Sequence, residues 1–181
     1  MDATDLVLGF VNSRDGTAAE PSDVDHFVDG AHFRDWLAAR SSTPADASDA
    51  DAATARELRE ALIDVLRPHS GEVAAERLAE AEEQLRRIAL RHPLTPVITA
   101  AGVTLTPAQP GLFGEVLAGV AELSLSGQWA RLKVCRAFPS RRVFVDHTRN
   151  RSAVYCSSHC ASKTAMRAYR ERKKAASSTT P

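Results

Sequence analysis

The stretch that decides the fold of the C-terminal part of this chain reads LKVCRAFPSRRVFVDHTRNRSAVYCSSHC and runs from Leu132 to Cys160. Apolar and basic residues alternate on both sides of residues 136–141, which predicts two short strands around a loop. The pair Cys156-x-x-x-Cys160 then begins a predicted helix that ends near Lys174. This segment is therefore expected to fold as a small β-hairpin followed by a helix.

All three cysteines of the chain lie in this stretch, at Cys135, Cys156 and Cys160. An odd, clustered set of cysteines is more typical of metal binding than of a disulfide framework. Zinc takes four ligands in a tetrahedron, and a module of about 45 residues needs such a link because its own core is small. The sequence predicts zinc at these cysteines, with three reduced, metal-free cysteines as the alternative. Candidates for the fourth ligand are His159 and His147, followed by Ser140 or water.

The predicted helix after Cys160 carries basic residues at successive spacings of four, three and four, so they share one face. Residues 131–174 hold 13 Lys and Arg against 2 Asp and Glu, whereas residues 1–130 hold 10 against 21. A dense basic segment binds a polyanion by releasing its counterions, and a basic helix fits the major groove of double-stranded DNA. The expected DNA contacts are Arg149, Arg151, Lys163, Arg167, Arg170 and Lys174.

The opposite face of this helix is expected to dock on the hairpin. Met166 and Tyr169 are its only large apolar residues, which is too few for a membrane-binding helix. No apolar run approaches the roughly 20 residues of a membrane span, and the N-terminus lacks a basic stretch before an apolar one. We therefore expect a cytoplasmic protein that does not bind a membrane.

Residues 1–130 are predicted to form an acidic, mostly helical domain. The apolar run at residues 6–12 is too short for periodicity to distinguish a helix from a strand. A polar loop is expected at residues 41–53, followed by a helix that Thr54 and Glu57 begin with a capping box. Apolar residues at helical spacing predict further helices around residues 33–37, 74–88 and 110–127, and β-rich runs flanking residues 100–102 predict a hairpin.

The predicted fold class is α+β, mostly α. It consists of a helical domain with a small hairpin over residues 1–130 and a hairpin-plus-helix module over residues 131–174. Residues 175–181 are small and polar apart from two alanines and a proline, and are expected to form a disordered tail.

The C-terminal module resembles the CGNR zinc finger of bacterial regulators. The stretch FVDHTRN at residues 144–150 matches the middle of that motif, and Tyr155-Cys156 takes the place of its usual Trp-Cys pair. Two departures stand out. Ser140 occupies the place of the motif's second cysteine, and Ala-Ser-Lys at residues 161–163 replaces Gly-Asn-Arg.

The N-terminal part is similar to the ABATE domain that commonly precedes this finger, through LGFVNS at residues 8–13 and ELREAL at residues 57–62. The resemblance implies a transcription regulator whose N-terminal domain senses a small ligand or a stress signal. It also implies Asn12 as a possible ligand contact. The Ser140 departure leaves the zinc site one cysteine short, and Lys163 lacks the fork geometry of the arginine it replaces.

Two other functions stay open from the residues alone. An RNA-binding or ribosome-associated module could use the same basic charge, although the segment has few aromatic residues for base stacking. A thiol-dependent enzyme could use Cys156 and Cys160 with His159, but no carboxylate lies at a spacing that would orient the histidine. We therefore expect a regulator and not an enzyme.

Overall fold

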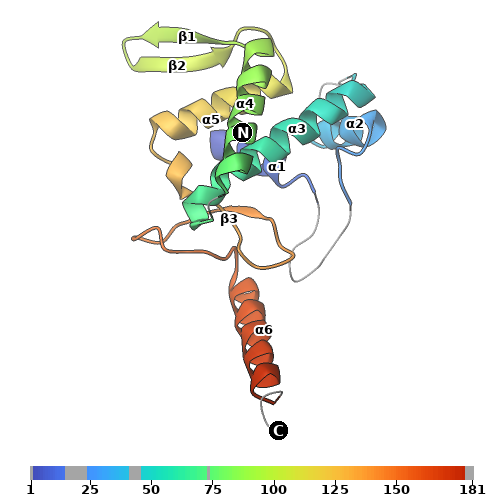
Figure 1. The fold of residues 1–181 in the computed structure, drawn as a ribbon. Helices are drawn as coiled ribbons and strands as arrows, with labels where there is room; N and C mark the ends of the chain where they lie inside the picture. The colour runs from blue at the N-terminus through green and yellow to red at the C-terminus, as the bar shows by residue number, and fades with distance from the viewer. Residues whose placement is uncertain (1, 15–23, 41–45, 73, 178–181) are drawn as a thin grey trace.

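The computed structural model describes residues 2–14, 24–40, 46–72 and 74–177. These residues form mainly helices, with two separate two-stranded antiparallel sheets, which confirms the α+β, mostly α fold class (Figure 1). The helices are α1 (Ala3–Val11), α2 (Gly30–Ala38), α3 (Asp49–Leu66), α4 (Ala75–Arg91), α5 (Leu112–Leu125) and α6 (Ser158–Ser177), with short 3-10 helices η1 (Arg67–Ser70) and η2 (Trp129–Arg131). The strands are β1 (Leu94–Thr99), β2 (Gly102–Pro107), β3 (Leu132–Val134) and β4 (Val143–Val145).

The first five helices surround one hydrophobic core, with α3 packed on α4 and α1 packed on α5. The aromatic rings of Phe10, Phe27 and Trp36 meet at its centre, where the Phe27 ring lies 5.0 Å from Trp36 and 5.2 Å from Phe10, centroid to centroid. The short apolar run at residues 6–12 is therefore part of a helix. Asp2 caps that helix by accepting a 2.8 Å hydrogen bond from the Asp5 N–H.

Helix α3 begins before the residue that the sequence pattern indicates. Ser48 is its N-cap, and the side chains of Ser48 and Asp51 each accept a hydrogen bond from the other's backbone N–H. The predicted start at Thr54 is wrong, and residues 49–53 of the expected loop are helical. The chain holds two capping signals six residues apart, and the earlier one prevails because it allows Ala52 and Ala55 to be fully buried.

The two hairpins differ in their surroundings. Strands β1 and β2 pair from Leu94–Pro107 to Thr99–Gly102, as the sequence predicts, and they are mostly exposed. Strands β3 and β4 pair from Leu132–Val145 to Val134–Val143, and their apolar side chains apart from Phe144 belong to the core of the helical domain. The second hairpin therefore completes the core of the body formed by α1 to α5.

Hydrogen bonds from three residues in two distant segments, the end of α1 and η1, hold this second hairpin in place. The Asn12 side chain, just after α1, donates to the Val143 carbonyl and accepts from the Val143 N–H, both at 2.9 Å. The Ser70 hydroxyl donates to the Val134 carbonyl at 2.8 Å and accepts from the Val134 N–H at 2.9 Å. The His69 ring nitrogen Nδ1 lies 2.9 Å from the Leu132 carbonyl oxygen.

Helix α6 extends away from the rest of the molecule (Figure 1). Its first turn is buried at Cys160, which is 1% exposed, whereas Met166 and Tyr169 further along are 52% and 55% exposed. The prediction that this face docks on the hairpin is wrong, because the core of the helical body already covers the apolar side of β3 and β4. The helix continues to Ser177 beyond the expected end at Lys174, and residues 178–181 lie outside the described residues.

Candidate metal centre and basic surface

The three cysteines converge at the junction between the second hairpin and α6. Their sulfur atoms all lie within 4.8 Å of one another, and the Cys156 and Cys160 sulfurs are 3.5 Å apart. All three are free thiols rather than disulfides. Residues that are 25 positions apart in the sequence thus form one cluster, in which Cys135 and Cys160 are buried and Cys156 is half-buried.

Backbone geometry places each cysteine. Cys135 directly follows β3, and its N–H donates to the Arg142 carbonyl at 2.9 Å, which extends the hairpin by one residue. The Cys156 N–H points to the Cys135 sulfur at 3.3 Å. Cys160 lies in the first turn of α6, where its N–H donates to the Ser157 hydroxyl at 3.2 Å. Strand, loop and helix therefore each supply one sulfur.

This donor set fits zinc. In a tetrahedral site with zinc–sulfur bonds of about 2.3 Å, neighbouring sulfurs lie about 3.8 Å apart, which falls between the 3.5 Å from Cys156 to Cys160 and the 4.8 Å within which all three sulfurs lie. Burial, together with the neighbouring Cys160 and Cys135 thiols, raises the pKa of Cys156 to about 12. A bound cation would stabilise the thiolates that burial disfavours. The cluster can thus hold zinc, which would tie α6 to the hairpin.

The two histidines that the sequence suggests as a fourth ligand are not part of the cluster. His147 and His159 are both exposed, and the potential metal-binding group found among the described residues contains the three cysteines alone. His159 neighbours Cys160 on α6, so its side chain leaves the helix about 100° away from the cysteine. Ser140 lies nearer, with its hydroxyl oxygen 4.0 Å from the Cys156 sulfur.

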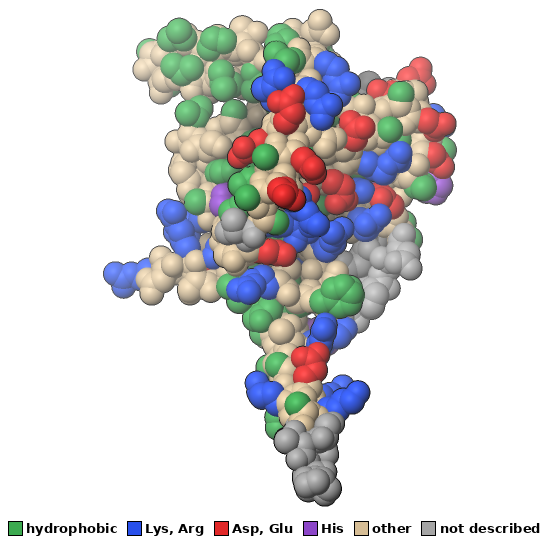
Figure 2. Space-filling view, viewed as in Figure 1, with side chains coloured by type: hydrophobic (Ala, Val, Ile, Leu, Met, Phe, Trp, Pro, Cys, Tyr) green, Lys and Arg blue, Asp and Glu red, His purple; other side chains and the backbone are tan. Residues whose placement is uncertain are grey.

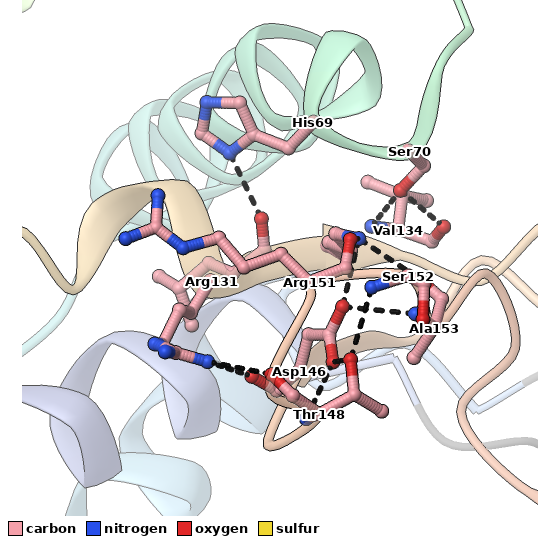
Figure 3. A network of polar contacts seen from close by, with 11 residues as sticks. His69, Ser70, Arg131, Val134, Asp146, Thr148, Arg151, Ser152 and Ala153 are labelled. Atoms are coloured by element: carbon pink, nitrogen blue, oxygen red, sulfur yellow. Dashed lines mark hydrogen bonds and ion pairs between the residues drawn. The ribbon is translucent and has the colours of Figure 1, made fainter.

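A second polar centre lies on the side of β3 that faces away from the helical core, around the buried carboxylate of Asp146 (Figure 3). Lys133 forms a 2.8 Å ion pair with Asp146, and both side chains are at most 5% exposed. Asp146 also accepts hydrogen bonds from the Thr148 N–H at 2.8 Å, the Thr148 hydroxyl at 2.6 Å and the Ala153 N–H at 3.0 Å. Burial alone would raise the pKa of Asp146, but these donors hold it well below its usual range.

This network fixes the loop at residues 147–153. The Lys133 ammonium also donates to the carbonyls of Arg151 and Ala153, and the Arg131 guanidinium donates to the carbonyls of Asp146 and Thr148 (Figure 3). Arg151 adopts a left-handed backbone with φ of 51°, which a residue with a side chain rarely does. The carbonyls point inward, and the side chains of Arg149 and Arg151 are exposed.

Sequence reasoning missed Lys133 and Asp146 as a pair. Lys133 counted only as one more cation of the basic segment, and Asp146 as one residue of a family motif. A signal was available, because Lys133 lies between two apolar strand residues, Leu132 and Val134, and Asp146 directly follows the partner strand. Since β3 faces the helical core on one side only, its middle residue points to the loop.

The basic residues of α6 lie where the helical spacing predicts. Lys163, Arg167, Arg170 and Lys174 are all exposed on the projecting helix. Figure 2 shows acidic and basic side chains mixed over the helical body but mainly basic ones along the projecting helix. Arg167 forms a 2.9 Å ion pair with Glu171 and lies 5.8 Å from the centroid of the Phe138 ring.

Asn12 has a structural role that the resemblance does not imply. Both ends of its amide are hydrogen-bonded to the Val143 backbone, so it connects α1 to β4. A ligand contact through Asn12 stays a prediction.

Comparison with protein families gives two matches that together span most of the chain. Residues 4–127 match the ABATE family, described as "Putative stress-induced transcription regulator", and residues 131–173 match the CGNR zinc finger. Both are regulator or zinc-finger families and not enzyme families. A search of curated proteins found none that matches. Within the described residues, no helix is both long enough and apolar enough to cross a membrane. The chain therefore belongs to the ABATE family and carries a C-terminal CGNR zinc finger.

Proposed function

We propose that this protein is a DNA-binding transcription regulator whose C-terminal module contacts double-stranded DNA. The observation that supports this most is the projection of α6, with its basic residues exposed, beyond the body of the molecule (Figure 1). A helix of 20 residues is about 30 Å long, and the major groove of B-DNA, about 12 Å wide, admits such a helix. Lys163, Arg167, Arg170 and Lys174 would then contact phosphates or base edges.

The fixed loop supplies a second set of contacts in this proposal. Arg149 and Arg151 extend from a backbone that the buried Asp146 and Lys133 hold in one conformation. A preformed loop loses less conformational entropy on binding than a mobile one. Arginine suits phosphate because its guanidinium can donate two parallel hydrogen bonds. We therefore assign these two arginines to phosphate positioning beside the helix.

The N-terminal domain would sense a small ligand or mediate assembly. This part of the proposal rests on the ABATE match and on the way the second hairpin joins both parts of the chain. A change in the packing of α1 or η1 would reach β3 and β4 directly, and through them Cys135 and the loop. We further propose that the protein acts in the bacterial cytoplasm, where its DNA would be.

The salt dependence of duplex binding tests this function. Each phosphate that the protein no longer neutralises should reduce the slope of log K against log salt by about 0.9. Arg167→Ala with Arg170→Ala should therefore weaken binding and flatten the slope by about two units, as measured by fluorescence anisotropy over a salt series. Arg86→Ala with Arg87→Ala removes the same charge from exposed positions on α4 and should leave the slope unchanged. Equal slopes for both double variants would contradict the assignment of α6.

One observation favours RNA or single-stranded nucleic acid as a second candidate partner. Phe138 is 78% exposed and Tyr169 is 55% exposed, and exposed aromatic rings beside arginines can stack on unpaired bases. The same titration with single-stranded RNA of equal length distinguishes the two. Tighter binding to RNA, abolished in Phe138→Ala, would replace the duplex proposal.

A thiol enzyme is not the function we propose. A nucleophilic cysteine needs a lowered pKa, and burial raises that of Cys156 to about 12. His159, the candidate base, is exposed.

A further inference from the structure

The metal centre has three thiolate donors where a tetrahedral zinc site has four ligands. The residue that faces the cluster from the hairpin loop is Ser140. It is 7% exposed, and its hydroxyl oxygen lies 4.0 Å from the Cys156 sulfur. It is also the residue at which the sequence departs from the cysteine of the finger motif. The side chain at position 140 therefore determines whether the protein itself supplies the fourth ligand.

A serine at this place cannot repeat what a cysteine does. A zinc ion with bonds of about 2.3 Å to sulfur and about 2.0 Å to oxygen brings the two donor atoms to about 3.5 Å. The observed 4.0 Å separation is longer, and the Arg142 N–H already lies 3.5 Å from the Ser140 oxygen. A neutral hydroxyl is also a weaker ligand for zinc than a thiolate. The position of Ser140 suits a hydrogen bond to a metal ligand better than direct ligation.

The two histidines that could complete the site lie outside the cysteine cluster. His147 and His159 are exposed, and neither belongs to the cluster of potential ligands among the described residues. Cys156, the ligand nearest to Ser140, is half-buried, whereas Cys135 and Cys160 are buried, so the cluster faces solvent most at Cys156. An external molecule can therefore approach the metal beside Cys156.

We propose that Ser140 holds an exchangeable water or hydroxide in the fourth coordination position, and that a small thiol can replace it. In the exchange, the metal–oxygen bond breaks and a metal–sulfur bond forms. The thiol proton passes to the departing hydroxide, or to solvent if water departs, and no atom is oxidised or reduced. The finger would thus act as a binding site for a soft monodentate ligand. This inference rests on metal binding by the cysteines and does not require DNA binding.

Cobalt substitution of the full chain tests the proposal, because the visible spectrum of Co²⁺ reports how many thiolates surround it. The wild type is expected to show the spectrum of three thiolates and one oxygen. Titration with 2-mercaptoethanol should shift its bands to longer wavelength and raise their intensity, as a fourth thiolate binds. Ser140→Cys should show the four-thiolate spectrum from the start and lose the response to added thiol.

Two further variants separate the alternatives. Ser140→Ala removes the hydroxyl that holds the oxygen ligand but leaves the position open, so it should respond at lower thiol concentrations than the wild type. A double variant, His147→Ala with His159→Ala, should keep the wild-type spectrum and the wild-type response. If Ser140→Cys does not fold, the thiol titrations of the wild type and of the alanine variants still test the proposal.

Several results would overturn the inference. A spectral change in the histidine variant would mean that a ring nitrogen completes the site. A wild-type spectrum that stays constant at saturating thiol would mean that the fourth ligand does not exchange. Cobalt binding by Ser140→Cys but not by the wild type would mean that three cysteines do not hold the metal. Because the readout is the metal spectrum, each of these results can be told apart from a failure to bind DNA.

Discussion

The ion pair between Lys133 and Asp146 couples one strand residue to the conformation of a whole loop. Both charges are buried, so each depends on the other for compensation. Removing one partner of a buried ion pair leaves a charge in a medium of low polarity and destabilises more than an exposed pair would. The role of this pair is to hold Arg149 and Arg151 in position as much as to stabilise the fold.

Lys133→Met tests how much the pair stabilises the fold. It keeps the length of the side chain but leaves the Asp146 carboxylate uncompensated, and it should lower the free energy of unfolding by about 3–5 kcal/mol. Urea denaturation followed by circular dichroism measures this change. Lys174→Met, at an exposed position on α6, should change it by less than about 0.5 kcal/mol. Equal effects of the two variants would contradict the buried pair.

A second buried pair makes the helical body sensitive to acid. Burial disfavours the charged form of Asp25, but hydrogen bonds from Arg59 at 2.7 and 2.8 Å and from the Phe27 N–H outweigh burial and lower its pKa to about 2. Because the folded pKa lies below the unfolded value of about 3.9, this group stabilises the fold above pH 4. The stabilisation is lost as the pH falls from about 4 to about 2.

The expected loss is about 2 kcal/mol over that interval, measured by denaturant titrations at several pH values. Asp25→Asn should be less stable at neutral pH and should show a smaller decrease below pH 4. If the free energy of unfolding of Asp25→Asn falls below pH 4 as steeply as that of the wild type, other carboxylates, Asp146 among them, cause the acid sensitivity.

At the scale of single residues, the sequence could predict the sulfur donors but not the polar positions around them. Cysteines stand out by their rarity and clustering, whereas Lys133 resembles every other cation of the basic segment. The histidines illustrate the reverse case. His159 is next to a cysteine in sequence, yet helix geometry turns it away from the cluster, and only a structure shows that direction.

Helix α6 depends on the metal centre for its attachment to the body. Cys160 is buried in its first turn, while the basic residues of the later turns are exposed. Removal of zinc should therefore release α6 and the loop at residues 136–142, because the apolar cluster that remains around the cysteines is small. The helices α3 and α4, which pack on each other in the core, should be unaffected.

Hydrogen exchange of the zinc-loaded chain before and after chelation measures this difference. Faster exchange is expected in residues 158–177 and 136–142, with unchanged exchange in α3 and α4. Uniformly faster exchange over the whole chain would mean that zinc stabilises the helical body as well. Unchanged exchange everywhere would mean that α6 is held without the metal.

Elements with a strong local pattern could be predicted from the sequence, and their partners could not. Residues close together in the sequence determine the helices α3, α4 and α5 and the turn between β1 and β2. The contacts of β3 come from residues far away in the sequence, since His69 and Ser70 precede it by more than 60 residues. The sequence shows an alternation around Val134 but not what covers its apolar side.

The charge pattern divides the chain into two parts, whereas the packing of side chains joins them. Residues 1–130 are acidic and residues 131–174 are basic, which favours an interpretation as two bodies. Packing joins the two parts, because Leu132, Val134 and Val143, which follow residue 130, are each about 1% exposed within the core of the helical body. The unit that projects is α6 with its metal centre.

A chain truncated after residue 130 tests where the body ends. It lacks three fully buried core side chains and the hydrogen-bond partners of Asn12 and Ser70, so it should lose cooperative thermal unfolding and bind a hydrophobic dye. A chain truncated after residue 156 retains β3 and β4 and should unfold cooperatively. If the shorter chain were as stable as the longer one, the hairpin would not be part of the core.

The shared hairpin also bears on how such a protein can be recombined. A zinc finger that could be exchanged between proteins as a unit would be connected to the helical body only through a linker. Here, a foreign finger inserted after residue 130 would have to match the amide of Asn12, the hydroxyl of Ser70 and the apolar wall of the host. The proposed DNA specificity would therefore change through the projecting helix, while the two strands would be inherited together with the domain in front of them.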